Sequence, residues 1–80
     1  MATADFELLG QWIHHRDADA FRDLVARHAS MVYATCRRVL RNATDAEDVA
    51  QECFQTLACL SKGPEGHLGA WLHRVATNRA

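Results

Sequence analysis

The residues of this sequence that could carry chemistry are its five histidines, its three cysteines and one short acidic stretch. Histidine and cysteine bind transition metals when their spacing lets several of them converge on one ion. His14 and His15 are adjacent, so on a helix they would point about 100° apart, and Cys36, Cys53 and Cys59 follow no metal-finger spacing. The sequence also has no glycine-rich phosphate loop, no His-Glu-x-x-His motif and no nucleophile motif. We therefore expect no enzyme, no metal site and no cofactor.

The acidic stretch is TDAEDVAQECFQ, residues 44–55, which holds four carboxylates and no basic side chain. If it is helical, three acids project to one side with two glutamines beside them, namely Asp45, Asp48 and Glu52 with Gln51 and Gln55. Such a face can be solvated, can bind a divalent cation, or can dock on a basic protein. Calcium prefers an oxygen-rich loop, and gathered like charge destabilises a fold unless a partner uses it. A basic protein partner is therefore the favoured interpretation.

The charge of the whole chain is nearly balanced but unevenly distributed. The net charge is −3 over residues 1–19, +4 over 20–41, −4 over 42–60 and +2 over 61–80. Blocks of alternating sign indicate either internal pairing between helices or more than one charged partner. No apolar run approaches the roughly 18 residues needed to span a membrane, and the first residues do not resemble a signal peptide. With an odd number of cysteines, these features favour a reduced, cytoplasmic setting and no membrane partner.

The elements that must position these side chains are helices. Apolar residues recur at helical spacing, no strand pattern is present, and only four glycines and one proline interrupt the chain. Eighty residues suffice for one small domain, so we expect an all-α fold, a compact bundle of about four helices formed by residues 1–80. The first helix is expected over Ala4–Arg16, with Thr3 as its candidate cap. Its predicted buried face consists of Phe6, Leu9 and Ile13.

The second expected helix, over roughly Asp19–Leu40, has the clearest amphipathic pattern and is long enough to organise the bundle. Its apolar stripe consists of Phe21, Leu24, Val25, His28, Val32, Cys36 and Val39. We interpret His28 as a hydrogen-bonded core residue rather than a metal ligand, because its neighbours on the stripe are apolar. Four arginines lie on the opposite side: Arg27, Arg37, Arg38 and Arg41.

The third expected helix carries the acidic stretch. Thr44 and Glu47 match the Thr-x-x-Glu capping box, so we expect the helix to begin there. The segment SKGPEG, residues 61–66, breaks the chain, because Gly63 can cap the third helix and Pro64 prevents its continuation.

The last expected helix begins near His67 or Leu68, and its predicted buried stripe is Leu68, Trp71, Leu72 and Val75. With the preceding loop it forms a second candidate surface, where a polynucleotide could follow Lys62, His67, His73, Arg74, Asn78 and Arg79. Trp71 could stack on a base, but its spacing favours a place in the core. The chain stops at Ala80 without a C-terminal helix signal, so we expect the native protein to be longer.

Three segments of the sequence occur in an order typical of one known family. They are DAFRDLVARHASMVYATCRRVL at 19–40, DAEDVAQECF at 45–54 and AWLHRVATN at 70–78. In this order they resemble region two of bacterial sigma factors, and most closely that of the small extracytoplasmic-function group. The resemblance covers about Asp17 to Arg79, and DAEDVAQECF is its most specific part.

The resemblance implies an all-helical transcription initiation domain without catalysis of its own. Domains of this family dock on the clamp helices of the largest subunit of RNA polymerase core. They also capture the unwound non-template strand of the promoter minus-ten element. By resemblance, the first role falls on the helix with Asp45, Asp48, Gln51 and Glu52, and the second on the loop and last helix, where Arg74 and Asn78 match. An anti-sigma factor is a further implied partner, and the family's second, duplex-binding domain would follow Ala80.

The sequence departs from the family pattern after Phe54. The family usually continues with an aromatic and basic run, whereas this chain has QTLACL, with Ala58 and Cys59 where Trp and Arg are common. The departures predict weak promoter contact or an unusual base preference. They also leave an alternative open, a divergent sigma-like interaction module that binds polymerase or a regulator without recognising a promoter. A metal-dependent enzyme is the third and least favoured hypothesis.

Overall fold

A computed structural model describes residues 4–80, which form four helices and contain no strand. The helices are α1 (Asp5–His15), α2 (Ala18–Leu40), α3 (Ala43–Ala58) and α4 (Leu68–Arg79). The prediction of an all-α bundle is therefore confirmed. No helix in this part of the chain is long and apolar enough to cross a membrane.

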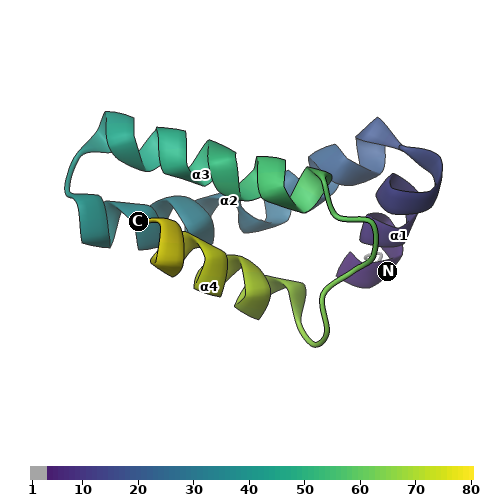
Figure 1. Cartoon of the computed structure of the whole chain (residues 1–80). Helices are drawn as coiled ribbons and strands as arrows, with labels where there is room; N and C mark the ends of the chain where they lie inside the picture. Colours follow the sequence, from purple (N-terminus) through teal and green to yellow (C-terminus); the bar gives the residue numbers. More distant parts are fainter. Residues whose placement is uncertain (1–3) are drawn as a thin grey trace.

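The long helix α2 organises the bundle, because each of the other three helices packs against it. Figure 1 shows α3 running back along α2 in the opposite direction, and α4 running in the same direction as α2. The bundle is elongated, with extents of 36 × 21 × 21 Å, and α1 lies at the end where α2 begins. The segment between α3 and α4 passes close to α1 before it returns to the bundle (Figure 1).

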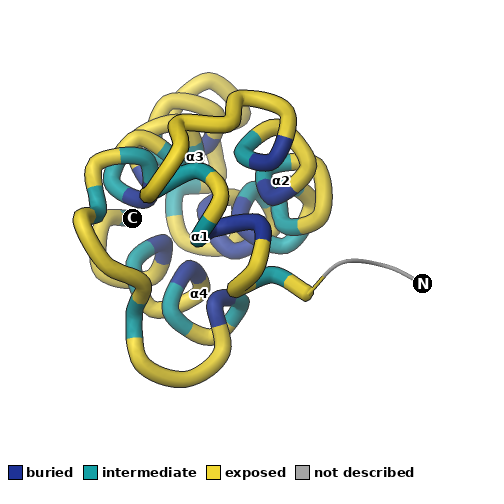
Figure 2. Tube along the Cα trace, turned by 90° about the vertical axis from the view of Figure 1, so that its right-hand side faces the viewer, coloured by how far each residue is buried: buried dark blue, intermediate teal, exposed yellow. Residues whose placement is uncertain are grey.

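The core lies where the four helices face one another, as the buried segments in Figure 2 show. Its fully buried large side chains are Leu24, Val32, Cys36, Cys53, Leu57 and Leu72. Burying one such aliphatic side chain contributes roughly 1.5–3 kcal/mol. Trp71 is half-buried and packs against this core, as its spacing predicted. These contacts hold α3 and α4 in fixed positions on α2, with their polar faces exposed.

Two apolar residues predicted to be buried are exposed instead. Phe6 is 75% exposed, because α1 buries the adjacent face formed by Leu8 and Leu9. Val39 is 51% exposed, whereas its neighbour Leu40 packs against the core. Thr3, the candidate cap of the first helix, lies outside the described residues. The N-cap of α1 is Ala4, which has no side chain that could cap the helix.

The capping box predicted for α3 is wrong. The helix begins at Ala43, and its N-cap is Asn42, whose side-chain oxygen accepts a hydrogen bond from the backbone N–H of Asp45 at 3.0 Å. Asparagine caps helices at least as well as threonine, so the earlier cap is favoured and Thr44 becomes part of the first turn. Its partner in the predicted box, Glu47, lies in the helix as an exposed side chain.

The predicted end of α3 is also wrong. The helix stops at Ala58 with Cys59 as its C-cap, so Gly63 caps nothing and lies in the following loop. Two side chains from the α1 end of the bundle bind the carbonyl oxygen of Ala58. Trp12 Nε1 donates to it at 3.0 Å and Arg16 Nη1 at 3.2 Å. A carbonyl at the end of a helix has no partner within the helix, and these two donors supply one.

Candidate functional site

The outer face of α3 is the first candidate surface, and we call it the acidic face. All its predicted members are exposed, which places three carboxylates and two amides on one side of the helix: Asp45, Asp48, Gln51, Glu52 and Gln55. The opposite side of α3 is anchored in the core by Ala46, Cys53 and Leu57, all with no exposed surface. The acidic face is therefore presented by a helix that cannot rotate without breaking the core.

One member of the acidic face has a partner within the domain. Arg79 Nη1 of α4 lies 3.7 Å from Glu52 Oε2, and both side chains are about half exposed. An exposed ion pair of this kind contributes less than about 1 kcal/mol to stability. It nevertheless places the Arg79 guanidinium beside α3. The sequence analysis placed Arg79 on one polynucleotide path with Arg74 and Asn78, and the pairing of Arg79 with Glu52 could not be predicted there.

The remaining predicted nucleic-acid residues lie on α4 and the loop before it. His73, Arg74 and Asn78 are all exposed on α4, with Thr77 between them. The Thr77 hydroxyl is already used, because it donates to the carbonyl of His73 at 2.8 Å. Lys62 and His67 are exposed in the loop and at the start of α4. The surface thus offers few cations, as the composition of this segment predicted.

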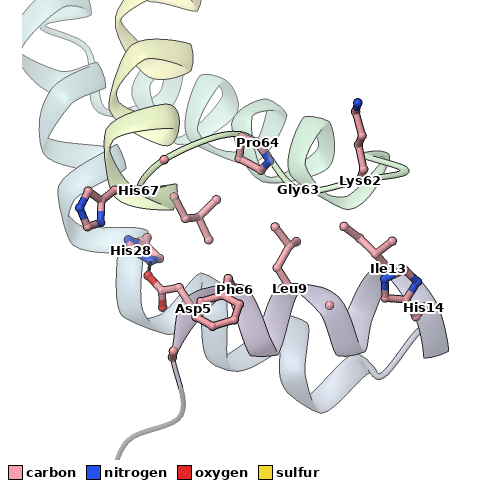
Figure 3. Close-up of a pocket in the computed structure, with 15 residues that line it drawn as sticks. Asp5, Phe6, Leu9, Ile13, His14, His28, Lys62, Gly63, Pro64 and His67 are labelled. Carbon is pink, nitrogen blue, oxygen red and sulfur yellow. Dashed lines mark hydrogen bonds and ion pairs between the residues drawn. The ribbon is translucent and has the colours of Figure 1, made fainter.

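A groove of about 760 Å³ lies between α1 and the segment that joins α3 to α4 (Figure 3). Phe6, Leu9 and Ile13 line it from α1. Leu9 is buried and Ile13 packs against the core, as predicted, whereas Phe6 is exposed on the groove wall. Gly63 packs closely on this wall, since a Cβ at that position would lie 3.4 Å from Leu9 Cδ2. Lys62 and His67 also line the groove, which therefore adjoins the loop side of the second candidate surface.

Asp5 and His28 line the groove and belong to a hydrogen-bonded cluster that also includes Arg27. His28 Nε2 lies 2.7 Å from Asp5 Oδ2, and Arg27 Nη1 lies 3.2 Å from Asp5 Oδ1. His28 was predicted to be a hydrogen-bonded core residue; the hydrogen bond is confirmed, but His28 is only partly buried and lines the groove rather than the core. A Cβ at position 69 would lie 3.7 Å from the His28 ring, so α4 begins directly against this histidine. The cluster joins α1 to α2, and the start of α4 packs against its histidine.

Trp12 is the structural residue that the sequence interpretation missed. Besides its hydrogen bond to Ala58, its ring stacks on Phe21 with a centroid distance of 4.8 Å, and Arg16 lies over it at 4.9 Å. Stacked aromatic pairs contribute roughly 0.5–1.5 kcal/mol beyond their burial. Trp12 therefore fixes α1 against both α2 and the end of α3. The signal available in the sequence was a tryptophan, with its indole N–H donor, one turn before the end of the first helix.

The cysteines form no metal site. Cys36 and Cys53 are fully buried and face each other across α2 and α3, whereas Cys59 is exposed at the end of α3. Burial raises the pKa of the Cys36 thiol, and burial together with the neighbouring Cys36 raises the pKa of Cys53 to about 11. Both thiols therefore stay protonated near neutral pH and act as small apolar side chains. Within residues 4–80 no three histidine, cysteine or acidic side chains converge as metal ligands would.

The geometry thus defines a helical domain with an acidic face on α3 and a sparse basic surface on α4, and sequence comparison identifies its family. The family model for sigma-70 region 2 matches residues 24–80. The chain belongs to this family. The match leaves out α1 and the first six residues of α2.

Curated relatives of this chain are RNA polymerase sigma factors. It is 39% identical over 64 residues to the ECF RNA polymerase sigma factor SigW of Bacillus subtilis, which covers 78% of this chain and 34% of the relative. It is 39% identical over 57 residues to the ECF RNA polymerase sigma factor SigE of Mycolicibacterium smegmatis, which covers 70% of this chain and 22% of the relative. It is 40% identical over 65 residues to the RNA polymerase sigma factor CarQ of Myxococcus xanthus, which covers 78% of this chain and 37% of the relative. The chain is therefore a region 2 domain of the ECF sigma type and spans between 22% and 37% of the length of these relatives. No solved structure matches it significantly.

Proposed function

We propose that this domain acts in transcription initiation, by docking on RNA polymerase core and holding the unwound non-template strand of the promoter minus-ten element. The observation that carries the proposal is the acidic face of a rigidly anchored α3 in a chain that belongs to the sigma-70 region 2 family. Both partners belong to the cytoplasm of a bacterial cell, and an anti-sigma factor is a further proposed partner.

In this proposal, the acidic face of α3 binds the clamp helices of the largest core subunit of RNA polymerase. Asp45 and Asp48 make no ion pair within the described residues, and Gln51 and Gln55 flank them as neutral donors and acceptors. Lys and Arg on a partner helix would give these carboxylates charge-assisted hydrogen bonds, which are about twice as strong as neutral ones. Because the helix is fixed before docking, little conformational entropy is lost when the partner binds.

The DNA side of the proposal assigns the single strand to α4 and the loop before it. Arg74 is an exposed cation that suits a phosphate, and Asn78 is an exposed amide one turn away that can both donate to and accept from a base edge. Lys62, His67 and His73 extend the surface toward the loop. Arg79 would have to leave Glu52 before it could bind a phosphate, so its contribution is the smallest of the set.

The alternative is an interaction module that binds polymerase or a regulator without reading a promoter. It is favoured by the few cations around α4 and by Ala58 and Cys59, which stand where the family usually has an aromatic and a basic residue. In the structure, Trp12 and Arg16 donate to the Ala58 carbonyl, a backbone contact that does not depend on the side chain at this position. In the alternative, only the acidic face would be functional.

Two substitutions distinguish these functions when tested in the full chain with core polymerase and a pre-melted promoter bubble. Arg74→Ala should weaken binding of every DNA sequence and reduce the slope of log K against log salt by about 0.7, because one single-strand phosphate contact is lost. Asn78→Ala should relax the preference among bases and leave the slope unchanged. Thr77→Ala, between them on the same helix, is the control. Parent-like binding by both variants would favour the interaction module, and an equal loss over all sequences for both would exclude base reading by Asn78.

A further inference from the structure

Three arginines at the end of α2 have no role in the function proposed above. Arg37 and Arg38 lie in the last turn of the helix and Arg41 is its C-cap, and all three are exposed. In the described part of the chain their side chains make no hydrogen bond and no ion pair. The nearest acid on the same helix is Asp23, more than three turns away. This cluster, which we call the basic end of α2, accounts for most of the positive charge between residues 20 and 41.

Arg41 has an unfavourable backbone conformation for an arginine. Its φ is 57°, in the left-handed region, where glycine is the preferred residue after a helix. Cations near a helix C-terminus are favoured by the helix dipole, which accounts for Arg37 and Arg38. The dipole does not account for an arginine rather than a glycine at position 41, where glycine would relieve the backbone strain.

Arg16 gives a direct comparison, because it is the other non-glycine residue with positive φ among the described residues, at 51°. The Arg16 side chain has a use inside the domain: it donates to the Ala58 carbonyl and lies over the Trp12 ring. Arg41 adopts the same strained conformation with no such contact. Strain that is kept without an internal benefit points to a function outside the domain.

The basic end of α2 lies at the same end of the molecule as the C-terminus of α4 (Figure 1). The bundle is only 21 Å across in the directions perpendicular to its long axis, so the last turns of both helices face the same surroundings. The last turn of α4 carries Asn78, and α4 contains no acidic residue. A DNA strand held along α4 would therefore leave the domain next to the arginines of α2.

We propose that the basic end of α2 binds the phosphodiester backbone of the DNA adjoining the strand held by α4. The ligand is nucleic-acid phosphate, which the planar guanidinium group binds through two parallel hydrogen bonds. This proposal rests on the proposed DNA-binding function of α4 and extends the DNA contact beyond the melted segment. Arg41, at the tip of the cluster, contributes most, and Arg37 lies on the same side of the helix.

The test uses the full chain bound to core polymerase and two DNA probes. The first is a short single strand that covers only the melted segment, and the second is a bubble with duplex arms. Arg41→Gly should raise the melting temperature of the free protein by a few degrees, because it relieves the left-handed strain. The same variant should bind the duplex-armed bubble more weakly, with the salt slope reduced by about 0.9 for the lost phosphate contact. Binding of the short strand should not change.

Arg22→Gln is the matched control, since Arg22 is an exposed arginine at the opposite end of α2. Three results would overturn the inference: unchanged binding of the duplex-armed bubble by Arg41→Gly, an equal loss in Arg22→Gln, or a loss of core polymerase binding without DNA. The last result would identify the basic end as a site for an acidic protein segment. Failure of the parent protein to bind either probe would instead overturn the proposed function of α4, and this inference with it.

Discussion

The cap of α3 decides where the acidic face begins, and replacing Asn42 tests it. In the structure, the Asn42 side chain satisfies the N–H of Asp45, while its backbone carbonyl accepts the N–H of Ala46 at 2.9 Å. Asn42→Ala removes the first bond and keeps the second. The position is exposed, so water can replace the lost acceptor. The free energy of unfolding should therefore fall by about 1 kcal/mol, the typical value for loss of an N-cap, rather than by about 2 kcal/mol. For a domain of this size that lowers the melting temperature by about 4–8 °C.

Thr44→Ala is the matched control for the cap. Thr44 lies in the first turn and is exposed, and alanine has the higher helix propensity, so this change should leave the melting temperature unchanged or slightly raised. Asn42→Ser should restore most of the stability, because serine is also a good N-cap. Thermal unfolding followed by circular dichroism measures all three variants. If Thr44→Ala destabilised the domain more than Asn42→Ala, the capping box at Thr44 would be correct and the observed cap would be refuted.

Three further predictions concern the end of α3 and the thiols. Trp12→Phe keeps the stack on Phe21 but loses the hydrogen bond to the Ala58 carbonyl. The free energy of unfolding, measured by chemical denaturation, should therefore fall by about 1 kcal/mol. An unchanged free energy of unfolding would show that the bond contributes nothing. In the native protein, a thiol reagent should label Cys59 and leave Cys36 and Cys53 unmodified, and rapid labelling of all three would contradict their burial. Because the folded pKa of Cys53 is raised from 9.0 to about 11, its contribution to stability is complete below pH 9.0. It should be lost as the pH rises toward 11, and Cys53→Ala should remove that part of the alkaline destabilisation.

The fold followed from the sequence because its strongest signal is local. The periodicity of α2 and α3 predicted which side of each helix is buried, and Leu24, Val32, Cys36 and Cys53 are fully buried as that pattern requires. The exposure of the acidic face follows from the same periodicity. The helix ends were less predictable, since Asn42 and Thr44 are both competent caps and only the packed structure selects between them.

The parts of the candidate site that the sequence could not predict depend on contacts between distant segments. Glu52 meets Arg79, and Trp12 meets Ala58, only after α1, α3 and α4 have packed on α2. Phe6 has the spacing of a core residue, but α1 packs on α2 through Leu8 and Leu9, which leaves Phe6 on the wall of the groove. Periodicity places a residue on a side of its helix and does not say which neighbour, if any, covers that side.

Charge reversal on the acidic face tests the central proposal most directly. Asp48 is exposed and anchors no helix end, so Asp48→Lys should leave the helical content and melting temperature nearly unchanged. The measurement is the affinity of the full chain for RNA polymerase core in the absence of DNA, with Glu65→Lys, an equal reversal in the exposed loop, as the control. Loss of a charge-assisted contact costs roughly 1.5–3 kcal/mol. We therefore expect Asp48→Lys to bind core about 10- to 150-fold more weakly and Glu65→Lys to bind like the parent. Parent-like binding by Asp48→Lys would contradict the assignment of this face to polymerase.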